Sequence, residues 1–423
     1  MSKATVKCEV HGIRSAFAPR QIAFNTGADL SLKLGSAVGP QGISLTAADL
    51  LDVGATVFQI DRHITSWRST NAPTLIRLRM KLRKPNAWST HAIETLQSLL
   101  HILGNVVWKI EFEKGLNVDI PKHKKEKTQR IRQVALFSGG VDSTCGAMTL
   151  RNEVAETKLV SFYRGQKTLQ ASLASELGFS VPVQWSMNWA RDPGRGRSFY
   201  FRSFMFLSLA GAVAESWNVR TVFQFENGIL ATAIPPTPYW MMTKHAHPSL
   251  HQNMVELFRS LFGGKWKILN PFLALTKREC VQRATNGMER ATAMRLLSRT
   301  ETCWYLRSNN VFGGKKRPGR SCGVCVPCLL RNTAIPGEGH QFDLRKDTIK
   351  NHRRKGEAFR AYYAFLRRVL DANKSSAKFY VALPAAGRQL VQNQYGLELD
   401  DLQRLFGTFA REFMETFCGG EAV

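Results

Sequence analysis

The spacing of apolar residues predicts regular structure in the first part of the chain. Alternation of apolar and polar side chains in residues 76–82 and 106–112 predicts two strands, each with one buried face. Between them, residues 89–103 have helical apolar spacing behind Ser89, a residue type that caps helices. Residues 45–57 predict a further helix. Residues 1–120 therefore read as an α+β accessory domain, and without catalytic spacing we expect it to serve docking or dimerisation.

A different pattern begins after a basic linker at 121–132. Short apolar runs alternate with helical segments over residues 133–340, which predicts a doubly wound parallel sheet of the α/β class. Ligands of such sheets bind at the carboxyl ends of the strands. The strands are expected at 134–137, 158–163, 181–185 and 220–225, and the helices at 144–151, 168–177 and 199–216.

The last segment, residues 341–423, predicts a helical C-terminal extension. Apolar side chains that share one helical face are expected to pack onto the core of the protein: Phe359, Tyr362, Tyr363, Phe365 and Leu366.

Composition narrows the setting. The chain has 423 residues, of which 44% are hydrophobic, enough to bury real cores. It opens without the charged and apolar regions of a secretory signal, and its longest apolar run, residues 204–214, is too short to cross a bilayer. We therefore expect a cytoplasmic protein without membrane contact.

The formal net charge of +27 changes this picture, because it attracts nucleic acids, acidic proteins and anionic small molecules. Basic clusters lie at 122–127, 315–320 and 345–355 without interleaved aromatic residues. Such clusters favour electrostatic contact over base stacking. An acidic partner protein is therefore the preferred interpretation, and nucleic acid is the alternative.

The strongest chemical signal is a Ser-Gly-Gly-Val-Asp-Ser turn between a predicted strand and a predicted helix. Glycines let the backbone approach an anion, and a helix N-terminus adds N–H donors, so the turn can hold phosphate. The two serine hydroxyls can donate further hydrogen bonds, and the aspartate can organise the turn or bind Mg²⁺. The turn lacks the Gly-Lys-Ser/Thr ending of the common triphosphate loop. Its residues are Ser138, Gly139, Gly140, Val141, Asp142 and Ser143.

Four cysteines form the second chemical signal. Cys322, Cys325 and Cys328 make two overlapping Cys-x-x-Cys steps, and Cys303 can complete a tetrahedral thiolate site. We expect structural zinc. An iron–sulfur cluster is the alternative, since four thiolates suit it as well.

The turn resembles the loop of the PP-loop ATP pyrophosphatases, the adenine nucleotide alpha-hydrolase-like fold. Combined with Cys-x-x-Cys-x-x-Cys-Leu-Leu-Arg331, it resembles the 7-cyano-7-deazaguanine synthase (QueC) family over about residues 133–340. Further segments resemble that family: Phe162-Tyr-Arg-Gly-Gln-Lys167, Arg202-Ser-Phe-Met-Phe-Leu-Ser208, Thr276-Lys-Arg-Glu279 and Glu301-Thr-Cys-Trp304. The cysteine spacer is longer than in the family, and an arginine interrupts the first of these segments.

The resemblance implies that ATP, with Mg²⁺, adenylates 7-carboxy-7-deazaguanine and releases pyrophosphate held by residues 138–143. It implies catalytic roles for Ser138, Asp142, Ser143 and Lys277, although Lys277 could also be an exposed lysine at a helix start. It places substrate contacts at Gln166, Arg202, Glu226 and Asn227. Two of these have particular readings. An Asn-Gly turn alone would also explain Asn227. Arg202 lies in an otherwise apolar helix, where a buried guanidinium needs an anionic partner.

The added segments are absent from an ordinary QueC, a short single-domain enzyme. This architecture resembles the longer QueC-like proteins of bacterial antiphage systems, the QatC proteins. We hypothesise that the activated deazaguanine is transferred to an amine of a partner protein. The alternatives are free nitrile synthesis with ammonia for queuosine, modification of a tRNA base, and an inactive nucleotide-binding scaffold.

Overall fold

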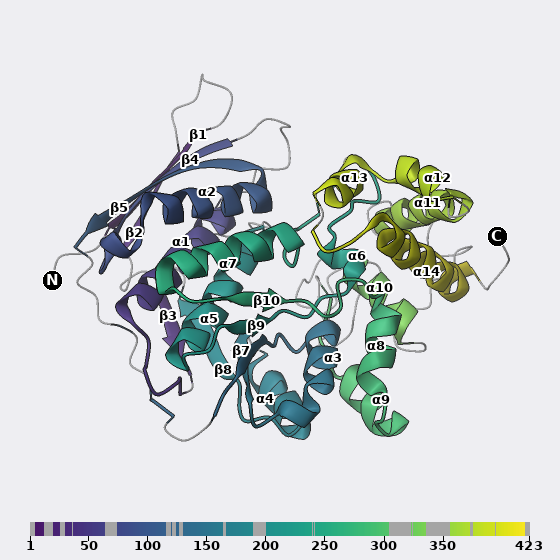
Figure 1. Cartoon of the computed structure of the whole chain (residues 1–423), viewed down its shortest axis with the longest axis horizontal. Helices are drawn as coiled ribbons and strands as arrows, with labels where there is room; N and C mark the ends of the chain where they lie inside the picture. The colour runs from purple at the N-terminus through teal and green to yellow at the C-terminus, as the bar shows by residue number, and fades with distance from the viewer. Residues whose placement is uncertain are drawn as a thin grey trace, which may run out of the picture. The chain divides into compact units, whose positions relative to one another are not determined.

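The chain has a mixed α/β structure that divides into two compact units (Figure 1). Unit 1 combines Met1–Ser138, Leu150–Gln224 and Thr243–Leu269, and unit 2 combines Gly139–Thr149, Phe225–Met242 and Asn270–Val423. Both units are assembled from separate stretches, so their limits differ from the boundaries expected at 120 and 340. The computed structural model describes residues 5–11, 20–25, 30–35, 37–63, 74–115, 120, 124–126, 130–163, 166–188, 200–238, 240, 242–303, 323, 325–335, 356–372, 375–393 and 395–418.

A four-stranded sheet of unit 1 has the order β2-β1-β4-β5. Strands β4 (Thr74–Leu82) and β5 (Val106–Lys114) confirm the two strands predicted from alternation, and they pair in parallel. Helix α2 (Thr90–Gly104) connects them, and the Ser89 side chain accepts a hydrogen bond from the Ala92 N–H at 3.2 Å, as predicted. The other two strands, which were not predicted, pair antiparallel with each other: β1 (Thr5–His11) and β2 (Arg20–Asn25).

The second sheet of unit 1 is rich in parallel pairs and has the order β10-β9-β6-β7-β8-β3. The expected strands appear as β6 (Gln133–Leu136), β7 (Thr157–Phe162), β8 (Val183–Asn188) and β9 (Thr221–Phe223). Two strands that were not predicted close its edges. Strand β10 (Lys267–Leu269) pairs in parallel with β9, and β3 (Ser31–Leu34) pairs antiparallel with β8. A segment near the chain start therefore belongs to the parallel-rich sheet.

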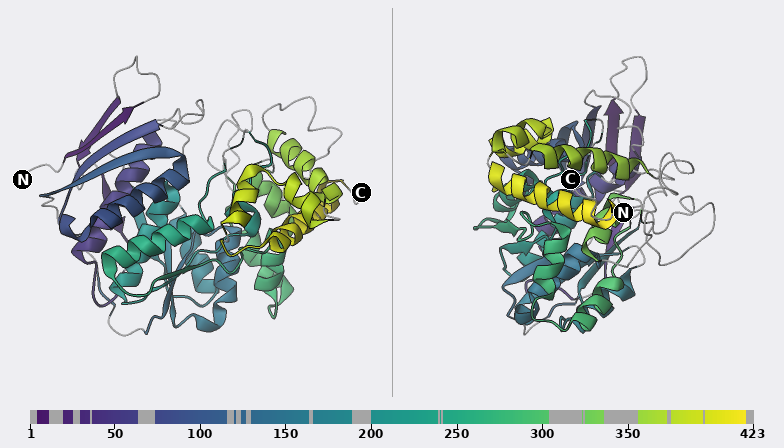
Figure 2. Two further views of the ribbon diagram at one scale, coloured as in Figure 1. Left: turned by 45° about the horizontal axis from the view of Figure 1, so that its top comes forward. Right: turned by 90° about the vertical axis from the view of Figure 1, so that its right-hand side faces the viewer.

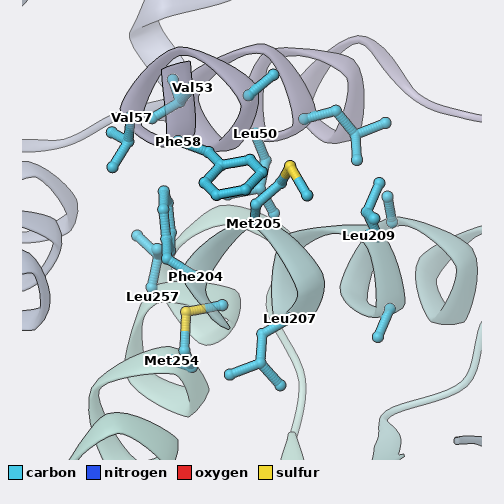
Figure 3. Close-up of a cluster of buried hydrophobic side chains, with 14 of the residues drawn as sticks. Leu50, Val53, Val57, Phe58, Phe204, Met205, Leu207, Leu209, Met254 and Leu257 are labelled. Carbon is cyan, nitrogen blue, oxygen red and sulfur yellow. The ribbon is translucent and has the colours of Figure 1, made fainter. Parts of the chain in front are cut away.

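Apolar helices form the core of unit 1. Leu50 of α1 (Leu45–His63) lies opposite Met205 of α5 (Arg202–Ser216), and Val53 and Met254 belong to the same cluster (Figure 3). All of these side chains are buried. The remaining helices of the unit are α7 (Pro248–Phe262), α4 (Lys167–Glu176) and the short 3-10 turns at Pro85–Ala87 and Arg151–Glu153.

Unit 2 is helical in its described residues. Helix α11 (Glu357–Ala372) lies beside α14 (Leu399–Cys418) (Figure 2). It buries Phe359, Tyr362 and Phe365 there, and the ring centroids of Phe359 and Phe413 are 5.3 Å apart. Of the apolar face predicted there, Phe359, Tyr362, Phe365 and Leu366 are buried, and Tyr363 is half-buried. The other helices are α3 (Val141–Thr149), α6 (Gly228–Ala231), α8 (Lys277–Thr285), α9 (Arg290–Ser298), α10 (Val326–Ala334), α12 (Ser376–Ala382) and α13 (Ala385–Gln392).

Within the described ranges, each helix is too short or too polar to cross a lipid bilayer.

Candidate functional site

The glycine turn leads from strand β6 into helix α3. Gly139 has a φ of 78°, in the left-handed region that favours glycine. The Gly140 carbonyl accepts hydrogen bonds from the Thr144 N–H at 3.0 Å and from the Ser143 hydroxyl at 3.1 Å. These bonds close a first helical turn, so α3 begins at Val141. The prediction that the loop extends through Ser143 is therefore wrong, because Val141, Asp142 and Ser143 are already helical.

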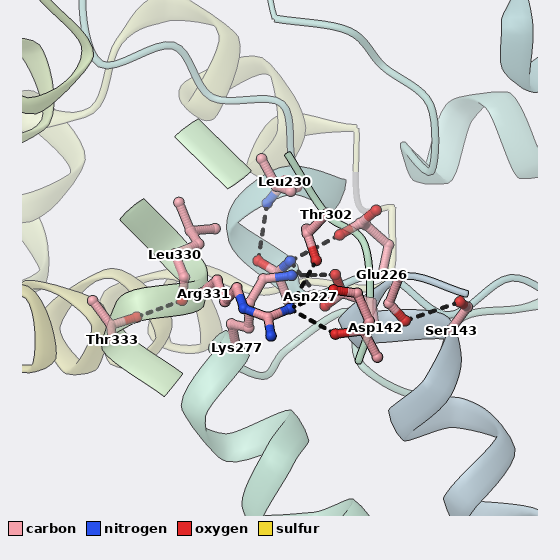
Figure 4. Close-up of polar contacts among 12 residues, drawn as sticks. Asp142, Ser143, Glu226, Asn227, Leu230, Lys277, Thr302, Leu330, Arg331 and Thr333 are labelled. Atoms are coloured by element: carbon pink, nitrogen blue, oxygen red, sulfur yellow. Dashed lines mark hydrogen bonds and ion pairs between the residues drawn. The ribbon is translucent and has the colours of Figure 1, made fainter. Parts of the chain in front are cut away.

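A buried ion pair joins this turn to helix α8. Asp142 at the start of α3 pairs with the Nζ atom of Lys277, the first residue of α8 (Figure 4). The exposed fraction is 7% for Asp142 and 1% for Lys277. The alternative of an exposed lysine at this position is therefore wrong. Each charge supplies the partner that the other requires, because a buried charge without a partner costs several kcal/mol.

Neighbouring charges shift the pKa values of this pair. Burial raises the pKa of Asp142, and the Glu226 carboxylate raises it further, against the opposing effects of Lys277 and Asn227. Burial alone would lower the pKa of Lys277, but Asp142 and Glu226 outweigh it, so the net pKa shift is upward. Lys277 therefore stays protonated and carries a fixed positive charge beside the glycine turn.

Asn227 connects the carboxylates of this site. Its side-chain NH₂ group donates to Asp142 at 3.2 Å and to Glu226 at 2.8 Å, while its carbonyl oxygen accepts from the Leu230 N–H at 3.3 Å. Asn227 is thus the N-cap of α6 and is fully buried. Asn270 holds the backbone of Glu226 through two hydrogen bonds of 3.1 and 2.8 Å. The structure therefore gives Asn227 a bridging position between the two carboxylates.

The start of α8 is held from two directions. Thr276 and Glu279 form a reciprocal capping box that fixes the first turn, the turn that contains Lys277. The Thr276 hydroxyl also donates to Glu412 of α14 at 2.9 Å, and Arg404 of α14 binds Glu279 at 2.6 Å. The described part of the C-terminal helices thus positions the residue before Lys277.

Glu412 makes the stability of this arrangement pH-dependent. Burial raises its pKa from 4.5 to about 7, against opposing contributions from Thr276 and Arg278. Since the folded state holds this proton more tightly, the free energy of unfolding should fall as pH rises from about 4.5 to about 7. The expected loss is on the order of 3 kcal/mol, because each tenfold difference in proton affinity between the folded and unfolded states corresponds to about 1.4 kcal/mol.

Glu412→Gln should remove this slope, because the amide stays neutral and keeps an acceptor for Thr276. At pH 8 the variant should be more stable than the wild type, and near pH 4.5 the two should be similar. Urea unfolding at several pH values measures this difference. Identical slopes for both proteins would contradict the assignment.

Three of the four predicted metal ligands lie together in unit 2. The sulfur atoms of Cys303, Cys325 and Cys328 are all within 4.8 Å of one another, and Cys325 and Cys328 are buried. Tetrahedral zinc with bonds of about 2.3 Å separates its sulfur ligands by roughly 3.8 Å, so this group can hold a metal such as zinc. Cys322, the fourth predicted ligand, lies outside the described residues.

The other predicted site residues belong to unit 1. Ser138 is exposed, and its carbonyl accepts from the Gln170 side chain at 3.1 Å. Gln166 precedes α4 and is partly buried. Arg202 is the first residue of α5, and its guanidinium lies 5.7 Å from the Phe206 ring centroid. It is only partly buried, because the end of the helix lets its side chain reach the surface, unlike the buried position that its apolar neighbours predicted.

Two residues that structure the site were not predicted from the sequence. Glu412 and Asn270 have no local pattern that identifies them, because their partners lie far away along the chain. Thr276 belongs to the segment Thr276-Lys-Arg-Glu279 that resembles a helix start of the family, and its capping role was not predicted although Thr-x-x-Glu is the pattern of a capping box.

These contacts define a site with a glycine turn, a buried cation and two carboxylates. The same unit contains the three cysteines Cys303, Cys325 and Cys328, which we call the cysteine cluster. The chain matches no protein-family model, and it matches no curated protein.

Proposed function

We propose that this chain is a PP-loop ATP pyrophosphatase, similar to the QueC family, which adenylates 7-carboxy-7-deazaguanine and passes it to an amine. The observation that carries the proposal is the buried Asp142–Lys277 pair directly behind the Gly139-Gly140 turn. It supports phosphate binding because a fixed cation and helical N–H donors are present at the same turn.

The proposed nucleotide site is the turn of residues 138–143. Backbone N–H groups of the turn and of the first turn of α3 would bind the β- and γ-phosphates, and the Ser138 hydroxyl would add a donor. Mg²⁺, when bound, neutralises phosphate charge, and the carboxylates of Asp142 and Glu226 are suited to hold it.

The proposed reaction has two steps. A carboxylate oxygen of the substrate attacks the α-phosphorus of ATP, the bond to the β-phosphate breaks, and pyrophosphate leaves with its negative charge. Lys277 and the N–H donors stabilise that charge as it develops. An amine then attacks the acyl carbon of the adenylate, AMP leaves, and the amine nitrogen loses a proton. In unit 2, Glu226 and Asn227 remain the proposed substrate contacts.

The cysteine cluster has a structural role in this proposal. Zinc would be held by Cys303, Cys325 and Cys328, with Cys322 as the fourth ligand predicted from sequence. Four thiolates leave no open position for water, so the metal would organise the fold and take no part in the chemistry.

The amine acceptor is proposed to be a partner protein with an acidic surface. The net charge of +27 supports this, because such a field attracts acidic macromolecules and speeds their encounter. The antiphage setting suggested by the resemblance is part of the same proposal.

The test is incubation of the purified chain with ATP, Mg²⁺ and 7-carboxy-7-deazaguanine, with and without ammonium, followed by mass spectrometry. We expect pyrophosphate and a bound acyl-adenylate without released nitrile, because the acyl-adenylate waits for a macromolecular amine. Free AMP should appear only as an amine or water attacks the acyl carbon. Nitrile that requires ammonium would instead identify a 7-cyano-7-deazaguanine synthase. AMP formation that depends on tRNA would favour RNA modification. ATP binding without any cleavage would favour a scaffold and overturn the proposed reaction.

A further inference from the structure

A short segment of unit 2, residues Thr300, Glu301, Thr302 and Cys303, follows helix α9 and touches two parts of the proposed site. We call these four residues the strap. The Glu301 N–H donates to the Gly139 carbonyl at 3.1 Å, and Cys303 belongs to the cysteine cluster. The strap thus joins the glycine turn to the cysteines within four residues.

The bond to Gly139 controls the direction of a phosphate donor. The Gly139 carbonyl and the Gly140 N–H belong to one planar peptide group, and they point in opposite directions. When Glu301 binds the carbonyl, the Gly140 N–H is directed away from the strap. Without that bond, the two glycines could rotate this peptide at little cost. The strap therefore fixes the direction of one of the donors in the proposed phosphate site.

Arg331 holds the other end of the strap. Its guanidinium donates to the Thr300 carbonyl at 3.0 Å and to the Thr300 hydroxyl at 2.6 Å. It also donates to the carbonyls of Leu297 at 3.0 Å and Ser298 at 3.3 Å, at the C-terminus of α9. Its exposed fraction is 3%. A helix C-terminus is favourable for a buried cation, because the last carbonyls carry partial negative charge.

Helix α10 and its N-cap therefore contact the strap at two places. Cys325 and Cys328 meet Cys303, and Arg331, one turn after Cys328, binds Thr300. Figure 4 shows Arg331 and Thr302 among the residues of the proposed nucleotide site. Any ligand that draws the three thiols together also restrains the strap and, through Glu301, the Gly139 carbonyl.

We infer that metal binding at the cysteine cluster and nucleotide binding at the glycine turn are thermodynamically coupled through the strap. Arg331 is the residue that positions the strap. This inference rests on the proposed function. Coupling between two sites is reciprocal, so metal should raise nucleotide affinity by the same factor by which nucleotide raises metal affinity. We expect a factor of about 10, within the range typical of coupled sites.

The test uses the full chain and the non-cleavable analogue α,β-methylene-ATP. Calorimetry would compare its affinity for zinc-loaded protein and for protein stripped by a chelator, with circular dichroism to verify folding. In parallel, a chromogenic chelator would report the zinc release rate with and without the analogue. We expect roughly 10-fold weaker nucleotide binding after stripping, and slower zinc release in the presence of the analogue.

Two variant pairs separate the strap from general damage. Arg331→Lys should keep zinc but lose most of the coupling, because an ammonium cannot reproduce the forked contacts. Arg388→Lys is the matched control, since Arg388 also donates to backbone carbonyls, those of Val381 and Leu383. Glu301→Pro removes the N–H that binds Gly139, whereas Glu301→Ala retains it.

The outcomes are distinct. Equal nucleotide affinity with and without zinc, or equal coupling in the Arg331→Lys and Arg388→Lys proteins, would overturn the inference and leave the proposed function standing. If Arg331→Lys does not fold, equal coupling in Glu301→Pro and Glu301→Ala would overturn it. Failure of zinc-loaded wild type to bind the analogue would overturn the proposed function and this inference with it.

Discussion

Lys277→Met should slow adenylation severely and destabilise unit 2. The substitution leaves Asp142 buried beside Glu226 without a cation, and removing one partner of a buried ion pair costs about 3–5 kcal/mol. It also removes the fixed charge that stabilises the departing pyrophosphate, for which we expect a loss of roughly 100- to 1000-fold in rate. Urea unfolding and ATP–pyrophosphate exchange measure the two effects.

The matched control is Lys378→Met, since Lys378 is an exposed lysine on α12 of the same unit. The double variant Asp142→Asn with Lys277→Met separates stability from chemistry. It should recover part of the lost stability, because the buried charge of Asp142 is removed together with that of Lys277, but it should stay as slow as Lys277→Met. A Lys277→Met protein as stable as Lys378→Met would mean that the pair does not stabilise the fold. An active Lys277→Met protein would exclude the proposed role of Lys277.

The sequence predicted those helices and strands whose signals lie within one short segment of the chain. Strands β4 and β5 and helix α2 were predicted because alternation, helical spacing and the Ser89 cap each occur within one short segment. Strand β3 was not predicted, because only four residues form it and its pairing partner β8 lies about 150 residues later. Pairing between distant segments leaves no pattern in either of them.

The site shows the same division. The glycine turn and the cysteines were visible because few residue types perform their chemistry, and their spacing is short. The burial of Lys277 was not visible, since helix starts commonly expose lysine, and only Asp142, 135 positions away, explains it. Glu412 acts on Thr276 across 136 positions. The start of α3 was placed late because the Ser143 hydroxyl was assigned to phosphate, whereas it donates to the Gly140 carbonyl.

Gly146→Ala should lower both stability and adenylation, because Gly146 is tightly packed beneath the glycine turn. Gly146 lies on α3 four residues after Asp142, on the same helical face. A methyl group there would come within 2.1 Å of the Phe225 ring, which itself packs on Phe272 with ring centroids 5.1 Å apart. The ring has little room to retreat, so α3 must shift and carry Asp142 away from Lys277.

Two effects of this substitution oppose each other, and their magnitudes decide the sign. Alanine is favoured over glycine in a helix by about 1 kcal/mol. Overpacking a core costs about 1–3 kcal/mol, and a contact this short belongs at the upper end of that range. We therefore expect a net loss of about 1–2 kcal/mol in urea unfolding, together with a large loss of adenylation. Adding Phe225→Leu, which makes room beside α3, should recover part of both. A Gly146→Ala protein that is more stable than the wild type would show that helix propensity outweighs the contact. It would mean that the Phe225 ring can move away from the added methyl group.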